Sequence, residues 1–131
     1  MNRRLRYQGL TILWALFVLI LCSMKMGKVE DSPMFFPGFD KLVHCGFYVV
    51  FTIFYCYGLI RQHNYTVFPF KYAVLAFIVA VAYGGAIELL QAYIFTWRDG
   101  SWDDLFADAV GAGMGVFGVL ITSVAFNYGK K

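Results

Sequence analysis

The sequence predicts an all-α integral membrane protein, a bundle of four transmembrane helices with both termini in the cytoplasm. Of its 131 residues, 60% are hydrophobic and only 15% are charged, and the mean hydropathy is +0.64. A soluble domain of this composition would lack the polar surface needed to cover its core. Four apolar windows also approach the roughly 20 residues that a helix needs to cross the hydrocarbon layer. We therefore predict a single membrane domain over residues 1–131.

The four windows follow one another with short connectors and leave no room for a separate soluble domain. They cover approximately residues 8–24, 39–60, 70–95 and 103–126. The first has the basic and apolar layout of a secretory signal, but no small-x-small cleavage pattern follows it, so we expect an uncleaved span. Helix breakers separate the others, with Pro33 and Pro37 before the second window, Pro69 before the third and Asp99-Gly100 before the fourth.

The direction of the spans follows from the basic residues, because Lys and Arg in short loops mark the cytoplasmic side. Seven of the eleven lie on the side of the two termini: Arg3, Arg4, Arg6, Arg61, Lys71, Lys130 and Lys131. All eight carboxylates lie toward the other, outer face. This division accounts for the basic residues as topology markers, so we expect no nucleic-acid partner.

Small residues predict close helix packing. Ala107, Gly111 and Gly115 form a ladder with a spacing of four, and Gly84-Gly85 precedes Glu88 by one turn. We expect these residues to bring the third and fourth spans together. The three cysteines lie inside apolar windows without paired spacing, so we expect them to be packing residues and not a disulfide framework or a metal site.

Polar side chains gather at three helix ends that the predicted topology brings to the outer face. The set is Asp40, Lys41, His44, Glu88, Gln91, Arg98, Asp104 and Asp108. Several members are three or four residues apart within one window and therefore share a helix face. An ionised side chain at a helix centre costs about 2.5 to 3.5 kcal/mol on insertion scales, so such groups usually face the bundle interior and pair. The pattern predicts an outward-facing polar pocket.

Helix capping is the alternative interpretation of part of this set. Ser101 and Asp104 match a capping box, and Asp103 also favours a helix start. His44 on its own is more typical of a packing histidine. Capping does not explain Glu88, which precedes a helix C-terminus, or Asp108, which lies one turn beyond the capping box. For these two carboxylates we predict Arg98 or His44 as the partner.

Three motifs occur in a fixed order: DKLVH at residues 40–44, IExxQ at 87–91, and RxGSxxDLxADxxG from Arg98 to Gly111. Together they resemble the VanZ-like family of small bacterial membrane proteins over about residues 39–120. The resemblance implies a multi-pass protein of the bacterial cytoplasmic membrane, and the family's namesake lowers susceptibility to the glycopeptide teicoplanin. It also places the family's polar positions on the eight residues named above.

The sequence departs from the family pattern at a few positions. Asp108 stands where the family typically has Asn, Cys45 where an aromatic residue is common, and Thr96-Trp97 where Pro-Gly often precedes the arginine. These departures bear more on the substrate than on the fold.

Three functions are compatible with such a pocket. The favoured hypothesis is binding or modulation of a lipid headgroup or a lipid-linked envelope precursor through Arg98 and Lys41, with no cofactor and no metal. The alternative is a membrane enzyme for acyl or phosphoryl transfer or hydrolysis, with His44 as general base or nucleophile. Its metal version would use His44, Glu88, Asp104 and Asp108 as ligands of Mg²⁺ or Mn²⁺. Ion translocation is disfavoured because no ionisable relay continues toward the cytoplasm.

Overall fold

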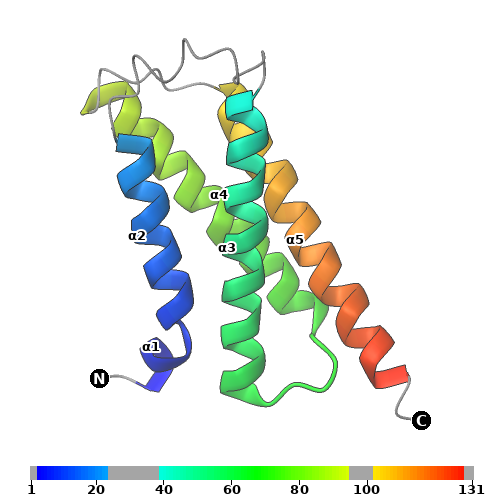
Figure 1. Ribbon diagram of the computed structural model, residues 1–131. Helices are drawn as coiled ribbons and strands as arrows, with labels where there is room; N and C mark the ends of the chain where they lie inside the picture. Colours follow the sequence, from blue (N-terminus) through cyan, green and yellow to red (C-terminus); the bar gives the residue numbers. More distant parts are fainter. Residues whose placement is uncertain (1–2, 24–38, 95–101, 129–131) are drawn as a thin grey trace.

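The computed structural model describes residues 3–23, 39–94 and 102–128, except for the side chains of residues 40 and 128. The regular secondary structure of this part of the chain is entirely helical, without a strand, which confirms the all-α class (Figure 1). The helices are α1 (Arg3–Tyr7), α2 (Gly9–Ser23), α3 (Phe39–His63), α4 (Phe70–Tyr93) and α5 (Trp102–Tyr128).

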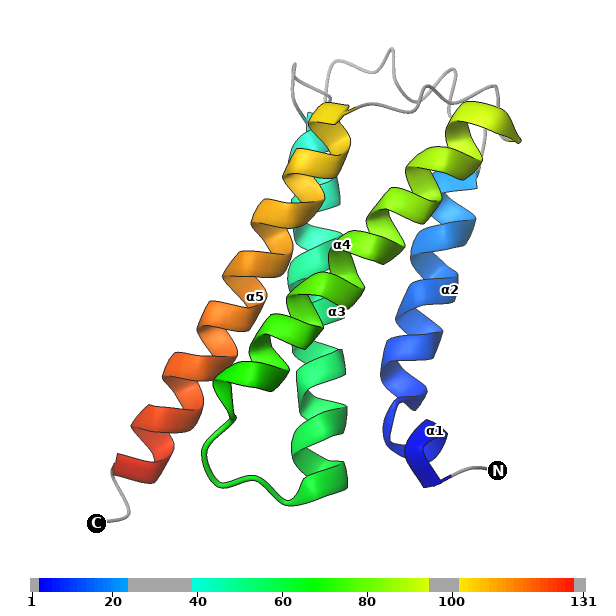
Figure 2. The same cartoon turned by 180° about the vertical axis from the view of Figure 1, so that it is seen from behind.

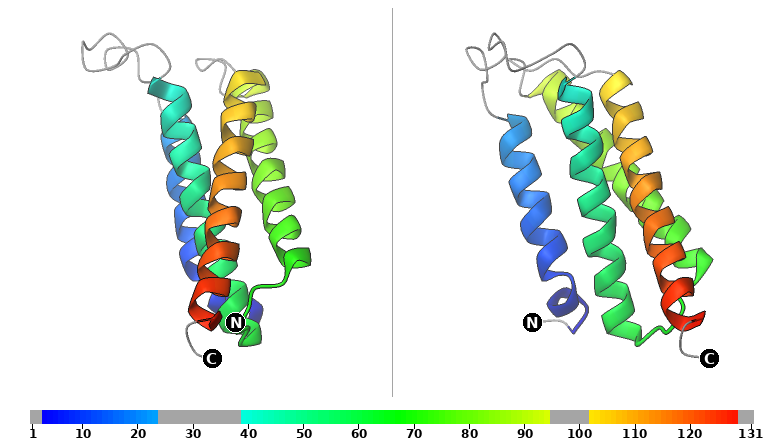
Figure 3. Two further views of the ribbon diagram at one scale, coloured as in Figure 1. Left: turned by 90° about the vertical axis from the view of Figure 1, so that its right-hand side faces the viewer. Right: turned by 45° about the vertical axis from the view of Figure 1, so that its right-hand side comes forward.

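From α2 to α5, successive helices alternate in direction, so the first and last described residues lie at the same end of the bundle (Figure 1). The most extensive helix contact is that of α3 with α5, followed by that of α4 with α5. Helix α4 is inclined to the others: its first turns lie beside α5, and its last turns lean toward α2 (Figure 2). Views from two further directions show α3 between α2 and α5 (Figure 3).

Three helices are long and apolar enough to cross a membrane: Lys41–His63, Phe70–Tyr93 and Trp102–Asn127. The shortest has 23 residues, or about 34 Å at the helical rise, against a hydrocarbon thickness of about 30 Å. Their length and composition are compatible with a multi-pass membrane protein. The predicted first span behaves differently: α2 has 15 residues, which cover only about 22 Å, and α1 is separated from it at Gln8.

Gln8 lies at the turn between the two N-terminal helices, and its side chain binds α3. Its Nε2 donates to the carbonyl oxygen of Tyr55 at 3.2 Å, and the Thr11 hydroxyl donates to its Oε1 at 2.7 Å. Gly58 leaves room for this contact, since a Cβ there would lie 2.5 Å from Gln8 Nε2. The polar residue at the head of the first apolar window therefore makes a tertiary contact with α3.

Side-chain donors that bind main-chain carbonyls join the N-terminal helices to α3 and α4. The four bonds are Gln8 to Tyr55, Trp14 Nε1 to Phe47 at 2.9 Å, the Tyr83 hydroxyl to Ala15, and Gln91 Nε2 to Cys22 at 3.0 Å. A helical carbonyl has a second lone pair for such a donor. In apolar surroundings each donor needs a partner, so the bonds fix α2 against its neighbours at successive levels.

The ladder of small residues on α5 packs on α3, and the prediction that it joins the third and fourth spans was wrong in its partner. A Cβ added to Gly111 would meet the Cys45 carbonyl, and one added to Gly115 would meet the Thr52 hydroxyl. Both glycines thus let the backbones of α3 and α5 approach closely. Gly84 on α4 does approach α5, because a Cβ there would lie 2.7 Å from Asp108 Oδ2.

The apolar core forms three successive groups along the bundle. One is built on Cys56, Phe68 and Ala76, the next on Tyr48, Phe51 and Ala80, and the third on Val18, Cys22 and Ile87. Cys22 and Cys56 are buried as free thiols in these groups, which agrees with their prediction as packing residues.

Candidate functional site

A buried pair of side chains joins α3 to α5 near the end of the bundle where both helices begin. His44 Nδ1 and Asp108 Oδ1 share a hydrogen bond of 2.9 Å, and the residues are 4% and 1% exposed. The absence of a side chain at Gly84 leaves the space that the Asp108 carboxylate occupies. His44 is thus the partner of Asp108, one of the two that the sequence predicts.

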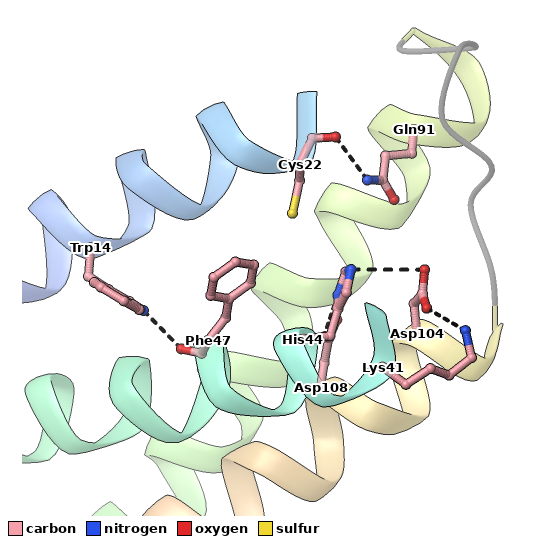
Figure 4. A network of polar contacts seen from close by, with 8 residues as sticks. All are labelled: Trp14, Cys22, Lys41, His44, Phe47, Gln91, Asp104 and Asp108. Atoms are coloured by element: carbon pink, nitrogen blue, oxygen red, sulfur yellow. Dashed lines mark hydrogen bonds and ion pairs between the residues drawn. The ribbon is translucent and has the colours of Figure 1, made fainter. Parts of the chain in front are cut away.

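Asp104 and Lys41 extend the pair toward the end of the bundle. Lys41 Nζ donates to Asp104 Oδ1 at 2.9 Å, and Asp104 Oδ2 lies 4.0 Å from His44 Nε2. Figure 4 shows the resulting row, in which Lys41, Asp104, His44 and Asp108 alternate between basic and acidic groups. The Lys41 side chain is 38% exposed and that of Asp104 only 10%, so the row leads from the surface into the bundle.

Glu88 brings α4 into the same site. One nitrogen of His44 and one carboxylate oxygen each of Glu88 and Asp108 all lie within 4.8 Å of one another. We call Lys41, His44, Glu88, Asp104 and Asp108 the polar cluster. Three helices that are distant in sequence therefore converge at one set of ionisable groups.

Gln91 and Tyr48 lie next to the polar cluster, and each has a buried oxygen without a hydrogen-bond partner in the described part of the chain. Both residues are 1% exposed. Gln91 donates to Cys22 on α2 through Nε2, which leaves Oε1 without a donor. The hydroxyl of Tyr48 likewise has no partner there. Tyr48 was not in the predicted set, although its spacing of four from His44 places it on the same face of α3.

The structure places six of the eight predicted side chains. It brings the five of the polar cluster together and connects Gln91 to α2. Arg98 and the side chain of Asp40 lie outside the described residues, as does Ser101 of the predicted capping box. Asp103 and Asp104 do lie in the first turn of α5, where acidic residues favour the helix dipole. The pairing of Asp104 with Lys41 was not predicted.

A groove of about 510 Å³ opens between α3 and α5 beside the polar cluster. Its lining includes Leu42 and Cys45 of α3 and Phe106 and Val110 of α5, with Lys41 and Asp103 as its charged members. Leu42 and Phe106 are 60% and 72% exposed, so the groove faces the side of the bundle. Its lining combines apolar walls with a lysine that also pairs with Asp104.

Three kinds of chemistry are open to this arrangement. Lys41 can neutralise a phosphate, the carboxylate of Asp108 can orient the imidazole of His44 for proton transfer, and the carboxylates with the imidazole can hold a cation. Comparisons with known protein families, with curated proteins and with solved structures gave no match. A function has to be inferred from the side chains themselves.

Proposed function

We propose that the protein is a VanZ-like component of the bacterial cytoplasmic membrane that binds the phosphate of a lipid headgroup or lipid-linked envelope precursor. The groove between α3 and α5 carries this proposal. Lys41 supplies the charge for a phosphate, while Leu42, Phe106 and Val110 supply an apolar wall for the chain attached to it. A phosphate bound to Lys41 would lie close to the carboxylate of Asp104, which also binds this lysine. Because the two anions repel each other, a lipid that carries a positive group as well as its phosphate should bind better than a simple anion.

Lipid capture by the full-length protein in detergent tests this proposal. Native mass spectrometry should detect a bound polyprenyl phosphate and little of the uncharged polyprenol. Lys41→Gln should weaken the phosphate lipid about tenfold, the lower end of what a charge-assisted hydrogen bond contributes. Lys71→Gln is the matched control, because Lys71 is exposed on the first turn of α4, at the other end of the bundle. Equal retention of phosphate and alcohol, or equal loss in both variants, would contradict the proposal.

The VanZ-like assignment is supported by the order and spacing of three motifs, whose described polar members meet at one end of the bundle. It is tested in a teicoplanin-susceptible bacterium that expresses the chain. Reduced susceptibility that is lost in Glu88→Ala and Asp104→Ala at equal expression would support it. An effect that persists in both variants would separate any phenotype from the polar cluster.

We further propose that α2 completes a fourth span and that both termini are cytoplasmic. The support is that α2 lies along α3, and that the first and last described residues lie at one end (Figure 1), where most of the described basic residues also lie. Reporters of cytoplasmic and periplasmic location, fused separately at each terminus, should both indicate the cytoplasm. Opposite locations would instead indicate three spans.

A second candidate function, hydrolysis or transfer at a lipid phosphate or ester, is favoured by the bond between Asp108 and His44. A carboxylate on Nδ1 fixes the imidazole so that Nε2 can accept a proton. Turnover of a lipid-linked phosphate that His44→Gln abolishes, and that Lys41→Gln only weakens, would support catalysis. Wild-type protein that binds the lipid without turning it over would leave binding as the function.

A further inference from the structure

We propose that His44, Glu88 and Asp108 bind a divalent transition-metal cation that links α3, α4 and α5. The proposal does not depend on lipid binding, since none of the three residues lines the groove beside Lys41. Their ligand atoms already lie within 4.8 Å of one another. Bonds of about 2.0 to 2.2 Å place neighbouring ligands of one ion about 3 Å apart. Nδ1 of His44 and Oδ1 of Asp108, at 2.9 Å, already have this separation.

The surroundings of the three residues supply a second and independent indication. The carbonyl oxygen Oε1 of Gln91, one turn after Glu88, is buried without a hydrogen-bond donor in the described part of the chain. A buried acceptor in that position costs free energy unless a donor, a water molecule or a cation meets it. The hydroxyl of Tyr48, one turn after His44, is in the same situation. Both oxygens suit a cation or the water molecules that it carries.

Charge also favours a cation at this point. The carboxylates of Glu88 and Asp108 converge on a single imidazole, while Lys41 is placed next to Asp104. Two carboxylates at this separation repel each other in apolar surroundings, and a cation between them removes the repulsion. Gly84 lets the Asp108 carboxylate lie against α4, the helix that carries Glu88.

The donor atoms indicate which metals fit. An imidazole nitrogen favours Zn²⁺ and other first-row transition metals, whereas carboxylate and amide oxygens favour Mn²⁺. The three proposed ligands include no thiolate, so they do not select soft metals. Mn²⁺ is the better probe of the two because it is paramagnetic and reports directly on the nuclei bound to it.

The experiment uses the full-length protein in detergent, stripped with a chelator and loaded with Mn²⁺. Pulsed paramagnetic resonance should show the coupling of one histidine nitrogen. The chain contains two histidines, and His63 is exposed at the opposite end of α3, so His63→Ala is a matched control. The coupling should persist in His63→Ala and disappear in His44→Ala.

Affinity gives a second measurement that does not rely on His44→Ala. Glu88→Gln should weaken Mn²⁺ binding at least tenfold, and Asp103→Asn, which alters an exposed carboxylate of α5 outside the three ligands, should not. Mn²⁺ should also raise the unfolding temperature of the wild type and not that of Glu88→Gln. Wild-type protein without nitrogen coupling, a coupling removed by His63→Ala, or equal affinity in the two carboxylate variants would overturn the proposal.

Discussion

The two histidines of the chain lie near opposite ends of α3 and are accommodated in opposite ways. His44 is 4% exposed and bonds to a carboxylate of α5. His63 is exposed and stacks on Tyr65 and Tyr72, with ring centroids 5.3 and 5.8 Å away. Inside the bundle the imidazole of His44 is hydrogen-bonded to a side chain of another helix, whereas at the surface that of His63 lies against aromatic rings. The same residue type is thus part of a three-helix site at one end and of a surface stack at the other.

The two grooves between α3 and α5 repeat this contrast. The groove beside the polar cluster has Lys41 and Asp103 in its lining. The other, of about 470 Å³, has no charged residue among its lining side chains and offers only hydroxyls such as those of Tyr57 and Ser123. Both grooves suit an apolar chain, but only the first offers charge to a headgroup. The proposed lipid site is therefore placed at the polar cluster.

Removal of the Asp108 carboxylate should give the largest difference in stability between changes at the two ends of α3. Asp108→Ala leaves His44 buried without its partner, so the free energy of unfolding should fall by about 3 to 5 kcal/mol. His63→Ala should change it by no more than about 0.5 kcal/mol, as is usual for surface positions. Asp108→Asn, which keeps an acceptor, should lie between them. Unfolding in detergent measures all three, and equal losses in Asp108→Ala and His63→Ala would remove the distinction between the two ends.

An added methyl group on α5 should destabilise the protein near the polar cluster, where α3 and α5 are in close contact. The same change farther along α5 should not. Gly111→Ala places a Cβ against the Cys45 carbonyl and should cost about 1 to 3 kcal/mol through overpacking. Gly118→Ala on the same helix meets no atom within 4 Å and should not lower the unfolding temperature, because Ala also favours a helix more than Gly does. A matching loss in Gly118→Ala would show that the contact with the Cys45 carbonyl is not the cause, because Ala favours a helix more than Gly does.

The smallest effect concerns the aromatic stack between α3 and α4. A hydrogen bond to Tyr72 raises the pKa of Tyr65 from its usual 10.0 to about 12. A raised folded-state pKa contributes stability that is complete below pH 10 and is lost as the pH rises toward 12. Tyr72→Phe should return the Tyr65 pKa toward 10. Ultraviolet titration of Tyr72→Phe, compared with the variant that also lacks Tyr65, isolates this phenol, and an unchanged titration would exclude the hydrogen bond as the cause.

Hydropathy predicted the bounds of α2 to α5 well because their apolar runs and breakers determine where they begin and end. The windows 39–60, 70–95 and 103–126 correspond to Phe39–His63, Phe70–Tyr93 and Trp102–Tyr128. The window 8–24 likewise corresponds to Gly9–Ser23, but the contact of Gln8 with α3 was not predicted, because it depends on Gly58, a residue on another helix. A pairing of this kind has no local pattern in the sequence.

The sequence predicted which helix faces carry the residues of the candidate site, but not every pair that these residues form. Spacing placed His44 and Asp108 on faces that could meet, and they do meet. The choice of Lys41 as the partner of Asp104 depends on how α3 is rotated against α5, which the contacts of Gly111 and Gly115 determine. Sequence spacing within one helix carries no information about that rotation.

In the hydrogen bonds that fix the N-terminal helices, the donor positions and the acceptor positions should differ in how well they tolerate mutation. In each of the four, the acceptor is a main-chain carbonyl, at Tyr55, Phe47, Ala15 or Cys22. Substitutions at these acceptor positions leave the hydrogen bond intact, so they can vary freely as long as their side chains fit. Substitutions at Gln8, Trp14, Tyr83 or Gln91 remove it outright. Sequence change in this part of the protein should therefore be concentrated on the acceptor side, and the four donor positions should change least.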